Sequence, residues 1–360
     1  MSKQRVIALL GRKDEPTDAV EEYCRYLGNA LVAHDIQLEI QRFPWEKIGW
    51  PQAFGQLEIS ASASSGQWVL VQYTALAWSS RGFPLKFLRV LSLLKSAGAR
   101  VGIVFHDVET FPGTRLVDRF RRTVQIRTMR RSLALADAAI FTVAIEQLSW
   151  VSGKPSHAVF IPVGPNLPIV TAMPPPAANP FLTIGIFSIT GGGAGARETK
   201  LIISAVTLAS ERLGNLRLSV FGRHAELRED DLRKAFQNLP VQLAVEGVIS
   251  PDQVVQKLST CDLLLFVRGP ISSRRGSAIA GIACGLPVIA LSGSETAAPV
   301  TEAGVVLIPR EDSQLIAEAL IRVLSDPVLR SQLATRSRTA YQLYFCWPAI
   351  AAKYAALLNR

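Results

Sequence analysis

Two adjacent arginines stand directly before a predicted helix start in the stretch ISSRRGSAIAG. Arg274 and Arg275 are followed by Gly276 and Ser277, where an apolar, helix-like run begins. Backbone N–H groups at a helix start point outward, and the helix dipole favours an anion there. Glycine lets a phosphate approach the backbone closely, and arginine forks fit phosphate oxygens. These residues fit a phosphate-binding site, and the alternative is a surface helix start with solvated arginines.

A glycine-rich stretch, TGGGAGA, follows a predicted strand and precedes Arg197 and Lys200. Its glycines either bring the backbone close to a ligand or form a plain flexible turn. The stretch lacks the GxxxxGK[ST] pattern, which excludes a P-loop ATPase. Arg223 ends another predicted strand and would lie at the same edge of a parallel sheet.

Gly11 ends the first predicted strand, and His106 and Asp107 follow a later one. A lone histidine is commonly structural, but ligands of open α/β sheets bind at the carboxyl ends of strands. The chain has four histidines and four cysteines, and none stand at metal-ligand spacing. We therefore expect no metal site.

The stretch RLVDRFRRTVQIRTMRRSLALAD is the most basic part of the chain. It carries seven arginines, and Asp118 is the one acidic residue before the final residue, Asp137. At helical spacing, Leu116, Phe120, Val124 and Met129 supply an apolar side. Such a helix either lies on an anionic membrane or packs on the core with a solvated basic face. The arginines are Arg115, Arg119, Arg121, Arg122, Arg127, Arg130 and Arg131.

The overall charge points to an anionic partner. The chain has 360 residues, 39 Lys and Arg, 29 Asp and Glu, and a formal net charge of +10. A nucleic acid, an acidic membrane or a phosphorylated ligand fits this charge. No nucleic-acid recognition motif accompanies it, so we expect no nucleic-acid partner. Scattered cysteines indicate a reducing cytoplasm, and we see neither a targeting segment nor an apolar run of spanning length.

Apolar runs alternate with helix-like segments throughout, which predicts an α/β fold with buried parallel strands. Strands are expected at 6–10, 37–42, 68–73, 101–105, 139–143, 158–161, 182–188, 216–221, 242–247, 263–267, 287–291 and 305–309. Helices are expected at 18–33, 84–96, 198–212, 251–260, 276–284, 313–324 and 327–344.

Seven prolines between positions 162 and 180 interrupt this alternation. We interpret the interruption as a linker, and one long loop inside a domain is the alternative. The predicted domains are therefore 1–168 and 180–340, with the linker at 169–179. Both are predicted to be doubly wound and Rossmann-like.

A series of motifs in the second half carries a family resemblance. In order, they are LTIGIFSIT, RETKLIISA, LRLSVFGR, VEGVISPDQVVQKLSTCDLLLF, GSAIAGIACGLPVIALSGSE, EAGVVLIP and FCWPAIAAKYAALL. This order resembles the C-terminal domain of retaining glycosyltransferases of the GT-B fold, family 4 (group 1) in particular. The first half is similar to the family's acceptor domain at Gly11 and His106.

The resemblance implies two Rossmann-like domains that face a central cleft, with residues 341–360 forming a helix that crosses back to the first domain. It implies transfer of a sugar from a nucleotide-diphosphate donor to a glycan, lipid-linked or small-molecule acceptor, as in polysaccharide biosynthesis. Neither a cofactor nor a metal is implied. We expect a cytoplasmic protein, with a peripheral position on the inner face of the membrane as a further hypothesis.

The resemblance also implies residue roles. His106 would lie near the transferred sugar and orient it, and Gly11 would belong to a loop of the cleft. The residues expected at the donor diphosphate are Arg197, Lys200, Arg223, Arg274, Arg275, Gly276 and Ser277.

One departure from the family concerns its pair of glutamates. Alignment on IACGLPVIA puts these positions at Ser272 and Ala280, so both carboxylates are absent. Glu295 and Glu302 are the candidates to bind the sugar or ribose hydroxyls instead. The alternative is a catalytically silent protein that binds a nucleotide sugar or scaffolds a glycan synthesis complex.

Overall fold

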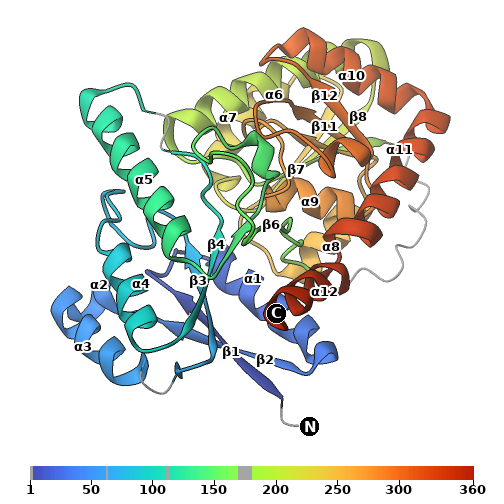
Figure 1. The fold of residues 1–360 in the computed structure, drawn as a ribbon. Coiled ribbons are helices and arrows are strands. Elements are labelled where there is room, and N and C mark those ends of the chain that lie inside the picture. The colour runs from blue at the N-terminus through green and yellow to red at the C-terminus, as the bar shows by residue number, and fades with distance from the viewer. Residues whose placement is uncertain (1–2, 62–63, 111–112, 169–180) are drawn as a thin grey trace. The chain divides into compact units, whose positions relative to one another are not determined.

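The chain folds into two compact α/β units (Figure 1). The computed structural model describes residues 3–61, 64–110, 113–168 and 181–360. The first unit comprises Met1–Pro162 and Trp347–Arg360, and the second comprises Val163–Cys346. Each unit holds one six-stranded parallel sheet, so the predicted α/β fold class is confirmed.

The first sheet has the strand order β2-β1-β3-β4-β5-β6. Its strands are β1 (Gln4–Leu10), β2 (Ile36–Arg42), β3 (Trp68–Tyr73), β4 (Arg100–Phe105), β5 (Ala138–Phe141) and β6 (Ala158–Phe160). The helices of this unit are α1 (Ala19–Leu31), α2 (Trp45–Ile48), α3 (Trp50–Ala61), α4 (Phe87–Ser96), α5 (Leu116–Leu135) and α12 (Trp347–Leu358).

Alternating side chains cover the two faces of the first sheet. Ile7 and Val69 belong to a core shared with residues of α3, α4 and α5, such as Val90 and Met129. Helices α1 and α12 pack against each other, and the Trp68 indole donates a hydrogen bond to Leu358 O of α12 (2.9 Å). Helices therefore lie on both faces, as a doubly wound sheet requires.

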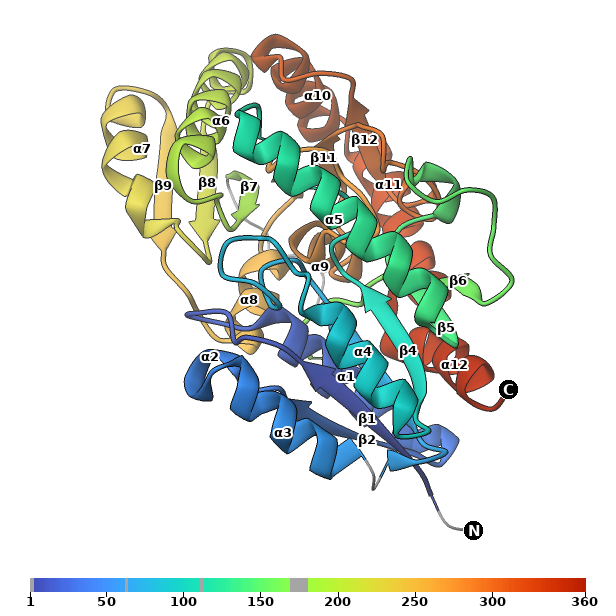
Figure 2. The ribbon, with the colours of Figure 1, turned by 60° about the vertical axis from the view of Figure 1, so that its left-hand side comes forward.

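The second sheet has the strand order β12-β11-β10-β7-β8-β9. Its strands are β7 (Leu182–Phe187), β8 (Leu216–Phe221), β9 (Val241–Glu246), β10 (Leu263–Phe266), β11 (Val288–Leu291) and β12 (Val305–Ile308). The helices are α6 (Gly192–Leu213), α7 (Glu229–Phe236), α8 (Pro251–Ser259), α9 (Gly276–Ala283), α10 (Ser313–Ser325) and α11 (Pro327–Ala340). Figure 2 shows α10 beside α6, and apolar residues of both pack on the sheet.

The unit boundaries differ from the predicted ones. Residues 163–168 and 341–346 belong to the second unit. The Val163 N–H donates to Ser273 O (3.0 Å), which ties the first of these segments to the second unit. Helix α11 continues into a π-helical turn, Tyr341–Phe345, so the returning helix begins only at Trp347. The predicted linker at 169–179 lies outside the described residues.

The strand orders identify where each sheet can bind a ligand. In the first sheet, β2 lies on one side of β1 and the later strands lie on the other side. In the second sheet, β8 and β9 lie on one side of β7, and β10, β11 and β12 lie on the other. Connections on opposite sides leave a crevice at the carboxyl ends of the two adjacent strands. The expected positions are between β1 and β3, and between β7 and β10.

None of the helices in the described segments combines the length and hydrophobicity that a bilayer crossing needs. All four cysteines are free thiols.

One close approach makes the packing of α11 testable. A Cβ on Gly304, just before β12, would lie 1.9 Å from Leu333 O of α11. Gly304→Ala is therefore expected to lower the free energy of unfolding by about 3 kcal/mol, because backbone must move. Denaturant titration measures this change. Gly193→Ala is the control, because its Cβ would meet nothing within 4 Å. Equal midpoints for Gly304→Ala and the parent would show that α11 shifts freely.

Candidate functional site

A pocket of ≈ 210 Å³ lies at the crevice between β7 and β10 of the second unit. Thr190 follows β7 and Arg268 follows β10, so both reach it from the strands' carboxyl ends. Helix α6 supplies a third wall. The lining residues are Thr190, Ala194, Arg197, Glu198, Leu201, Val267, Arg268, Gly269 and Glu311.

Helix α6 starts at this pocket because its glycines allow a close approach. A Cβ on Gly195 would lie 1.8 Å from Thr190 O, so only glycine brings the helix this near to β7. Gly192 and Gly193 are exposed in the first turn. The stretch TGGGAGA is thus largely the start of a 22-residue helix rather than a turn before it, which corrects the sequence interpretation. A helix start of this kind favours an anion.

The predicted cations around α6 fall at different depths. Arg197 lines the pocket, and Lys200 lies one turn further along the exposed side of the helix. Arg223 follows β8, where its N–H donates to Ser188 Oγ (3.2 Å). Arg268, which the sequence analysis missed, lies deepest, and burial lowers its pKa while the Glu198 charge opposes this shift.

Arg274 and Glu295 bind each other. Arg274 Nε and Nη2 donate to the Glu295 carboxylate at 2.7 and 2.8 Å, and Ser272 Oγ donates to Glu295 Oε2 at 3.0 Å. The side chains are 18% and 10% exposed. Burial raises the pKa of Glu295, but the hydrogen bonds and charge of Arg274 outweigh burial, so the net shift is downward. The Arg274 fork is therefore engaged by a carboxylate rather than presented to a diphosphate.

The start of α9 lies close to the same pocket. Arg275 is the N-cap residue, and a Cβ on Gly276 would meet nothing within 4 Å. Ser277 Oγ accepts a hydrogen bond of 3.4 Å from Arg268 Nη1. Arg268 thus connects the pocket at α6 with the predicted anion site at α9.

Glu302 lies away from these residues. It belongs to a 3-10 turn (Val300–Glu302) just before β12, at the amino edge of the parallel sheet, whereas the pocket lies at the carboxyl edge. Arg336 donates to Glu302 O (3.2 Å), and a hydrogen bond to the Glu302 carboxylate raises the pKa of Tyr344. Its position corrects the expectation that Glu302 binds donor hydroxyls.

A second pocket, ≈ 230 Å³, lies at the crevice between β1 and β3 of the first unit. Gly11 lines it, and a Cβ there would lie 2.3 Å from Ala77 O. His106 stands beside the pocket residues Gln72 and Asp107. Its Nε2 donates to Gln72 Oε1 (2.9 Å), and its ring meets Tyr23 edge-on.

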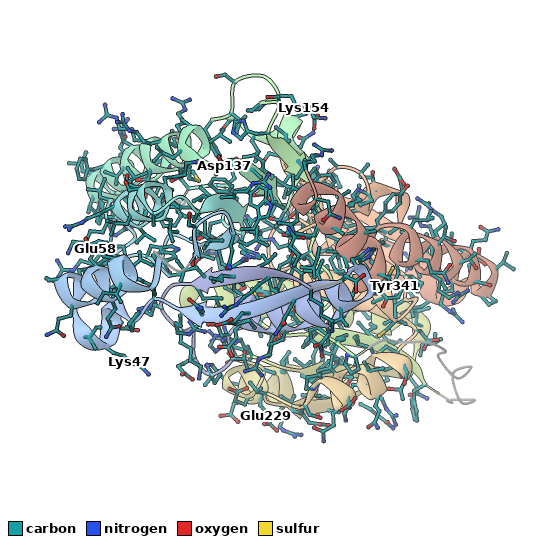
Figure 3. All side chains as sticks on the ribbon, turned by 60° about the horizontal axis from the view of Figure 1, so that its bottom comes forward. Lys47, Glu58, Asp137, Lys154, Glu229 and Tyr341 are labelled. Carbon is teal, nitrogen blue, oxygen red and sulfur yellow. The ribbon has the colours of Figure 1, made fainter. Side chains whose placement is uncertain are left out.

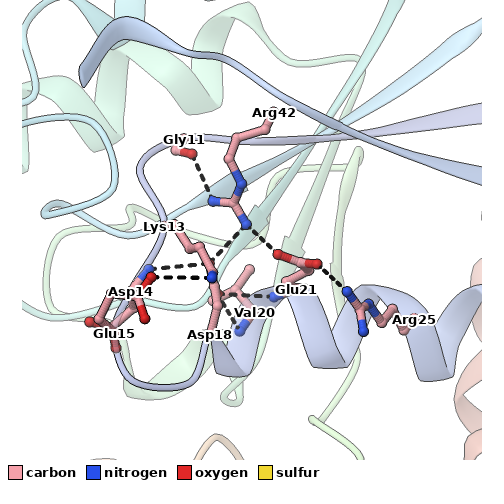
Figure 4. Close-up of polar contacts among 9 residues, drawn as sticks. All are labelled: Gly11, Lys13, Asp14, Glu15, Asp18, Val20, Glu21, Arg25 and Arg42. Atoms are coloured by element: carbon pink, nitrogen blue, oxygen red, sulfur yellow. Dashed lines mark hydrogen bonds and ion pairs between the residues drawn. The ribbon is translucent and has the colours of Figure 1, made fainter. Parts of the chain in front are cut away.

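Arg42 fixes the loop that forms one wall of this first-unit pocket (Figure 4). Its guanidinium donates to Gly11 O (3.0 Å), Asp18 Oδ2 (3.0 Å) and Glu21 Oε2 (2.6 Å). Asp18 also caps α1 by accepting from the Val20 and Glu21 N–H groups. The end of β1 and the start of α1 are thereby held together.

Arg268, Glu198 and Arg42 were missed by sequence reasoning. Arg268 follows a predicted strand, as Arg223 does, so a strand-end cation was the available signal. No sequence signal marked Glu198, because a glutamate beside two basic residues on a helix is typical of a solvent-exposed face. Within the described ranges, no three His, Cys, Asp or Glu side chains are placed to hold a metal ion.

Comparison with known proteins bears on the second unit and on the whole fold. Residues 190–326 match the family model of glycosyl transferases group 1, so this unit carries a domain of that type. No curated protein sequence matches the chain.

Solved structures share the architecture over nearly the whole chain. Anabaena HepE in complex with UDP and glucose is 14% identical, with a TM-score of 0.65 and 99% of both chains covered. Sucrose-phosphate synthase from Thermosynechococcus elongatus is 19% identical, with a TM-score of 0.66 and coverage of 99% and 98%. WaaG, a glycosyltransferase involved in lipopolysaccharide biosynthesis, is 14% identical, with a TM-score of 0.65 and coverage of 98% and 100%. The fold is GT-B.

The Arg274–Glu295 pair gives a prediction on stability. Glu295→Gln leaves a largely buried guanidinium uncompensated and is expected to cost about 3 kcal/mol near neutral pH. Because the folded-state pKa of Glu295 is depressed, its contribution is present above the unfolded pKa and is lost as pH falls through the folded value. Chemical unfolding of both proteins from pH 7 downward measures this, and a difference that stays constant into acid would contradict it. Glu318→Gln, on exposed α10 surface, is the control.

Proposed function

We propose that this protein is a glycosyltransferase that moves a sugar from a nucleotide-diphosphate donor to a glycan, lipid-linked or small-molecule acceptor, with retention of anomeric configuration. The observation that carries the proposal is the pocket between β7 and β10. It lies within the segment that matches the group 1 family and combines Arg197, Arg268 and the start of α6. The HepE structures contain UDP or UDP-glucose, which favours a uridine donor as the first to test.

The cations suit the chemistry of the leaving group. A breaking glycosidic bond leaves negative charge on the diphosphate, and fixed positive groups stabilise it. In this proposal Arg197 and Arg268 contact the diphosphate, and the Gly276 N–H and Arg275 approach it from α9. Lys200 and Arg223 contribute from the rim. Arginines supply this charge, so the proposal requires no metal ion.

Glu295 is the proposed substitute for a missing carboxylate. Ser272 occupies the position of the family's first glutamate, and its hydroxyl donates to Glu295 Oε2. A residue 23 positions later in sequence thus brings a carboxylate to this position. The Arg274 pair holds that carboxylate ionised, as an acceptor of sugar hydroxyls must be. Arg274 is therefore proposed to position Glu295, and Glu302 has no role.

The pocket of the first unit is proposed to bind the acceptor. Gly11 and the Arg42 network shape it, and His106 is held by Gln72 in a fixed orientation. In this proposal His106 orients the transferred sugar and is not a base. A silent nucleotide-sugar-binding protein remains the second candidate, favoured by the absence of carboxylates at Ser272 and Ala280.

Donor binding is the first functional test. Arg275→Ala and Arg268→Met are each expected to weaken binding of a nucleotide sugar by about 1.5–3 kcal/mol, since each removes a charged contact to phosphate. Calorimetry with UDP-glucose, GDP-mannose and ADP-glucose measures the affinity. Arg212→Ala, on the exposed last turn of α6, is the matched control. Unchanged affinity in both pocket variants would remove them from the site.

Turnover separates the two candidate functions. A transferase releases nucleoside diphosphate when an acceptor fraction is present. The His106→Ala variant is expected to lower the rate of this release while its unfolding midpoint changes little. Tight donor binding with neither transfer nor slow hydrolysis would establish the binding-protein alternative.

We also propose that the first unit attaches to an anionic membrane surface, on the cytoplasmic side that the free thiols favour. In this proposal the two sequence interpretations of the basic helix suit different parts of α5. Val124 and Met129 are buried against the core, whereas Leu116 and Phe120 are 81% and 64% exposed. Exposed arginines stand among them, including Arg119 and Arg122.

The first turn of α5 is held firmly in this exposed position. Asp118 is buried, accepts from the Arg115 N–H (3.2 Å) and forms an ion pair with Arg121 (2.7 Å). The Phe120 ring packs against Phe83. Apolar side chains ringed by arginine fit lipid headgroups and the acyl boundary below them.

Vesicle sedimentation tests the attachment. Replacing Arg119 and Arg122 by Glu is expected to weaken binding to acidic vesicles at low salt by more than about 2 kcal/mol, at about 1 kcal/mol per basic residue removed. The pair Arg212→Glu and Arg322→Glu makes the same charge change in the second unit and is the control. Binding that is equal for neutral vesicles, or absent for both, would contradict the proposal.

A matched pair of apolar variants separates insertion from simple charge attraction. Leu116→Asp is expected to weaken vesicle binding, whereas Ile59→Asp on α3 is not. Both residues are 81% exposed, but Leu116 stands among arginines, whereas Ile59 on α3 is next to the acidic Glu58, which is labelled in Figure 3. Equal losses in the two variants would contradict a defined docking surface.

A further inference from the structure

Glu198 is an almost fully buried carboxyl group that the proposed donor chemistry does not use. It is 5% exposed and lines the pocket between β7 and β10. Its Oε2 accepts a hydrogen bond from the Thr190 N–H (2.9 Å). Among the residues that the structure describes, Oε1 has no hydrogen-bond partner. A buried polar atom without a partner is costly, so this oxygen is poised for a ligand.

The charged pocket residues around Glu198 lie on α6, after β10 and after β12. Arg268 follows β10 and is itself largely buried, with no described partner for its Nε. Arg197 stands one residue earlier on α6, and Glu311 lies on the exposed side of the pocket. The charge of Arg228 also reaches Glu198, while Arg223 acts on Arg268.

Burial dominates the ionisation of this carboxyl group. It raises the pKa of Glu198. The backbone and side-chain hydrogen bonds from Thr190 and the charges of Arg268 and Arg228 oppose this shift without cancelling it. In the free protein the pKa of this carboxyl group is therefore higher than that of an ordinary glutamate.

We propose that Glu198 takes up a proton from solvent when the diphosphate of the donor enters this pocket, and that its neutral carboxyl group donates a hydrogen bond through Oε1 to a ligand oxygen. The inference rests on the proposed function, because the nucleotide sugar supplies the diphosphate. No covalent bond changes, and one proton moves from solvent to Glu198.

Electrostatics determines the direction of the effect. A diphosphate and a carboxylate that share one small, poorly hydrated pocket repel each other, so the bound state favours the protonated acid. The pKa of Glu198 is then higher in the complex than in the free protein. Affinity rises as pH falls between these two values, by at most about tenfold per pH unit, and is constant outside them.

His224 is the competing proton acceptor. A Cβ on Gly191, the N-cap of α6, would lie 3.2 Å from His224 Nε2, so the imidazole stands beside the same helix start. Imidazole is a common proton acceptor in proteins, so the experiment has to separate His224 from Glu198. His224 has a φ of +62°, a conformation that asparagine tolerates, so His224→Asn removes the imidazole with little strain.

Calorimetry with intact nucleotide sugars tests the proposal. Their phosphates are diesters that do not titrate near neutral pH, so any proton taken up belongs to the protein. Titrations of UDP-glucose, GDP-mannose and ADP-glucose in two buffers of different ionisation enthalpy, from pH 5.5 to 8.5, measure the uptake. The parent and His224→Asn are expected to take up close to one proton at pH values between the pKa of Glu198 in the free protein and its pKa in the complex. Glu198→Gln is expected to take up none.

The glutamine variant also makes a positive prediction. Its amide N–H replaces the acid O–H, so Glu198→Gln is expected to bind across the whole pH range as tightly as the parent does at low pH. Thermal melting checks that each variant is folded. Absence of proton uptake in the parent overturns the inference whether or not a variant folds.

Each contrary outcome has a distinct meaning. Donor binding without proton uptake in the parent overturns this inference and leaves the proposed function intact. Uptake that persists in Glu198→Gln, or disappears in His224→Asn, assigns the proton to another group and also overturns it. If no nucleotide sugar binds the folded parent, the proposed function fails and this inference fails with it.

Discussion

The pairing of β7 with both β8 and β10 is the constraint on which the site of the second unit depends. The chain leaves β7 toward one side for two strands and returns to its other side for the next three. Thr190 and Arg268 thereby follow adjacent strands although 78 positions separate them in sequence. Helix α6 has to begin between them, and Gly195 permits this only because it has no Cβ to meet Thr190 O.

Two carboxyl–arginine arrangements of opposite character lie at the carboxyl edge of the second sheet. Glu295 and Arg274 hold each other with two aligned hydrogen bonds, which fixes the position and the charge of the carboxylate. Glu198 and Arg268 line the pocket, and among the described residues Glu198 Oε1 and Arg268 Nε have no hydrogen-bond partner. The first pair is thus positioned by its own contacts, whereas the second keeps polar atoms that a ligand can satisfy.

Much of the fold could be predicted because buried parallel strands are continuous apolar runs. All twelve described strands coincide with predicted ones to within two residues at each end. Helix α7 was missed since its sequence, EDDLRKAF, has few apolar residues to mark a period, and α2 and α3 were missed since aromatic residues and a proline obscure theirs.

The candidate site was less predictable for a geometric reason. Arginines at predicted helix starts and strand ends were found from local sequence alone. Which strand ends are neighbours depends on strand order, so Arg268 and Glu198 could not be brought together beforehand. Glu302 was placed wrongly because the loop after β11 runs from the carboxyl edge of the sheet back to the amino edge before β12 begins.

Helix α12 imposes an order on how the two units are completed during synthesis. Its residues 347–358 follow the whole of the second unit in sequence, yet they belong to the first. Tyr354 Oη lies 2.9 Å from Tyr23 Oη, and Leu358 O accepts from Trp68. On the ribosome, the second unit has its full complement of residues before the first has its own. The first unit must therefore wait with one face of its sheet incompletely covered, and a nascent chain stalled before residue 347 would expose that apolar face to chaperones.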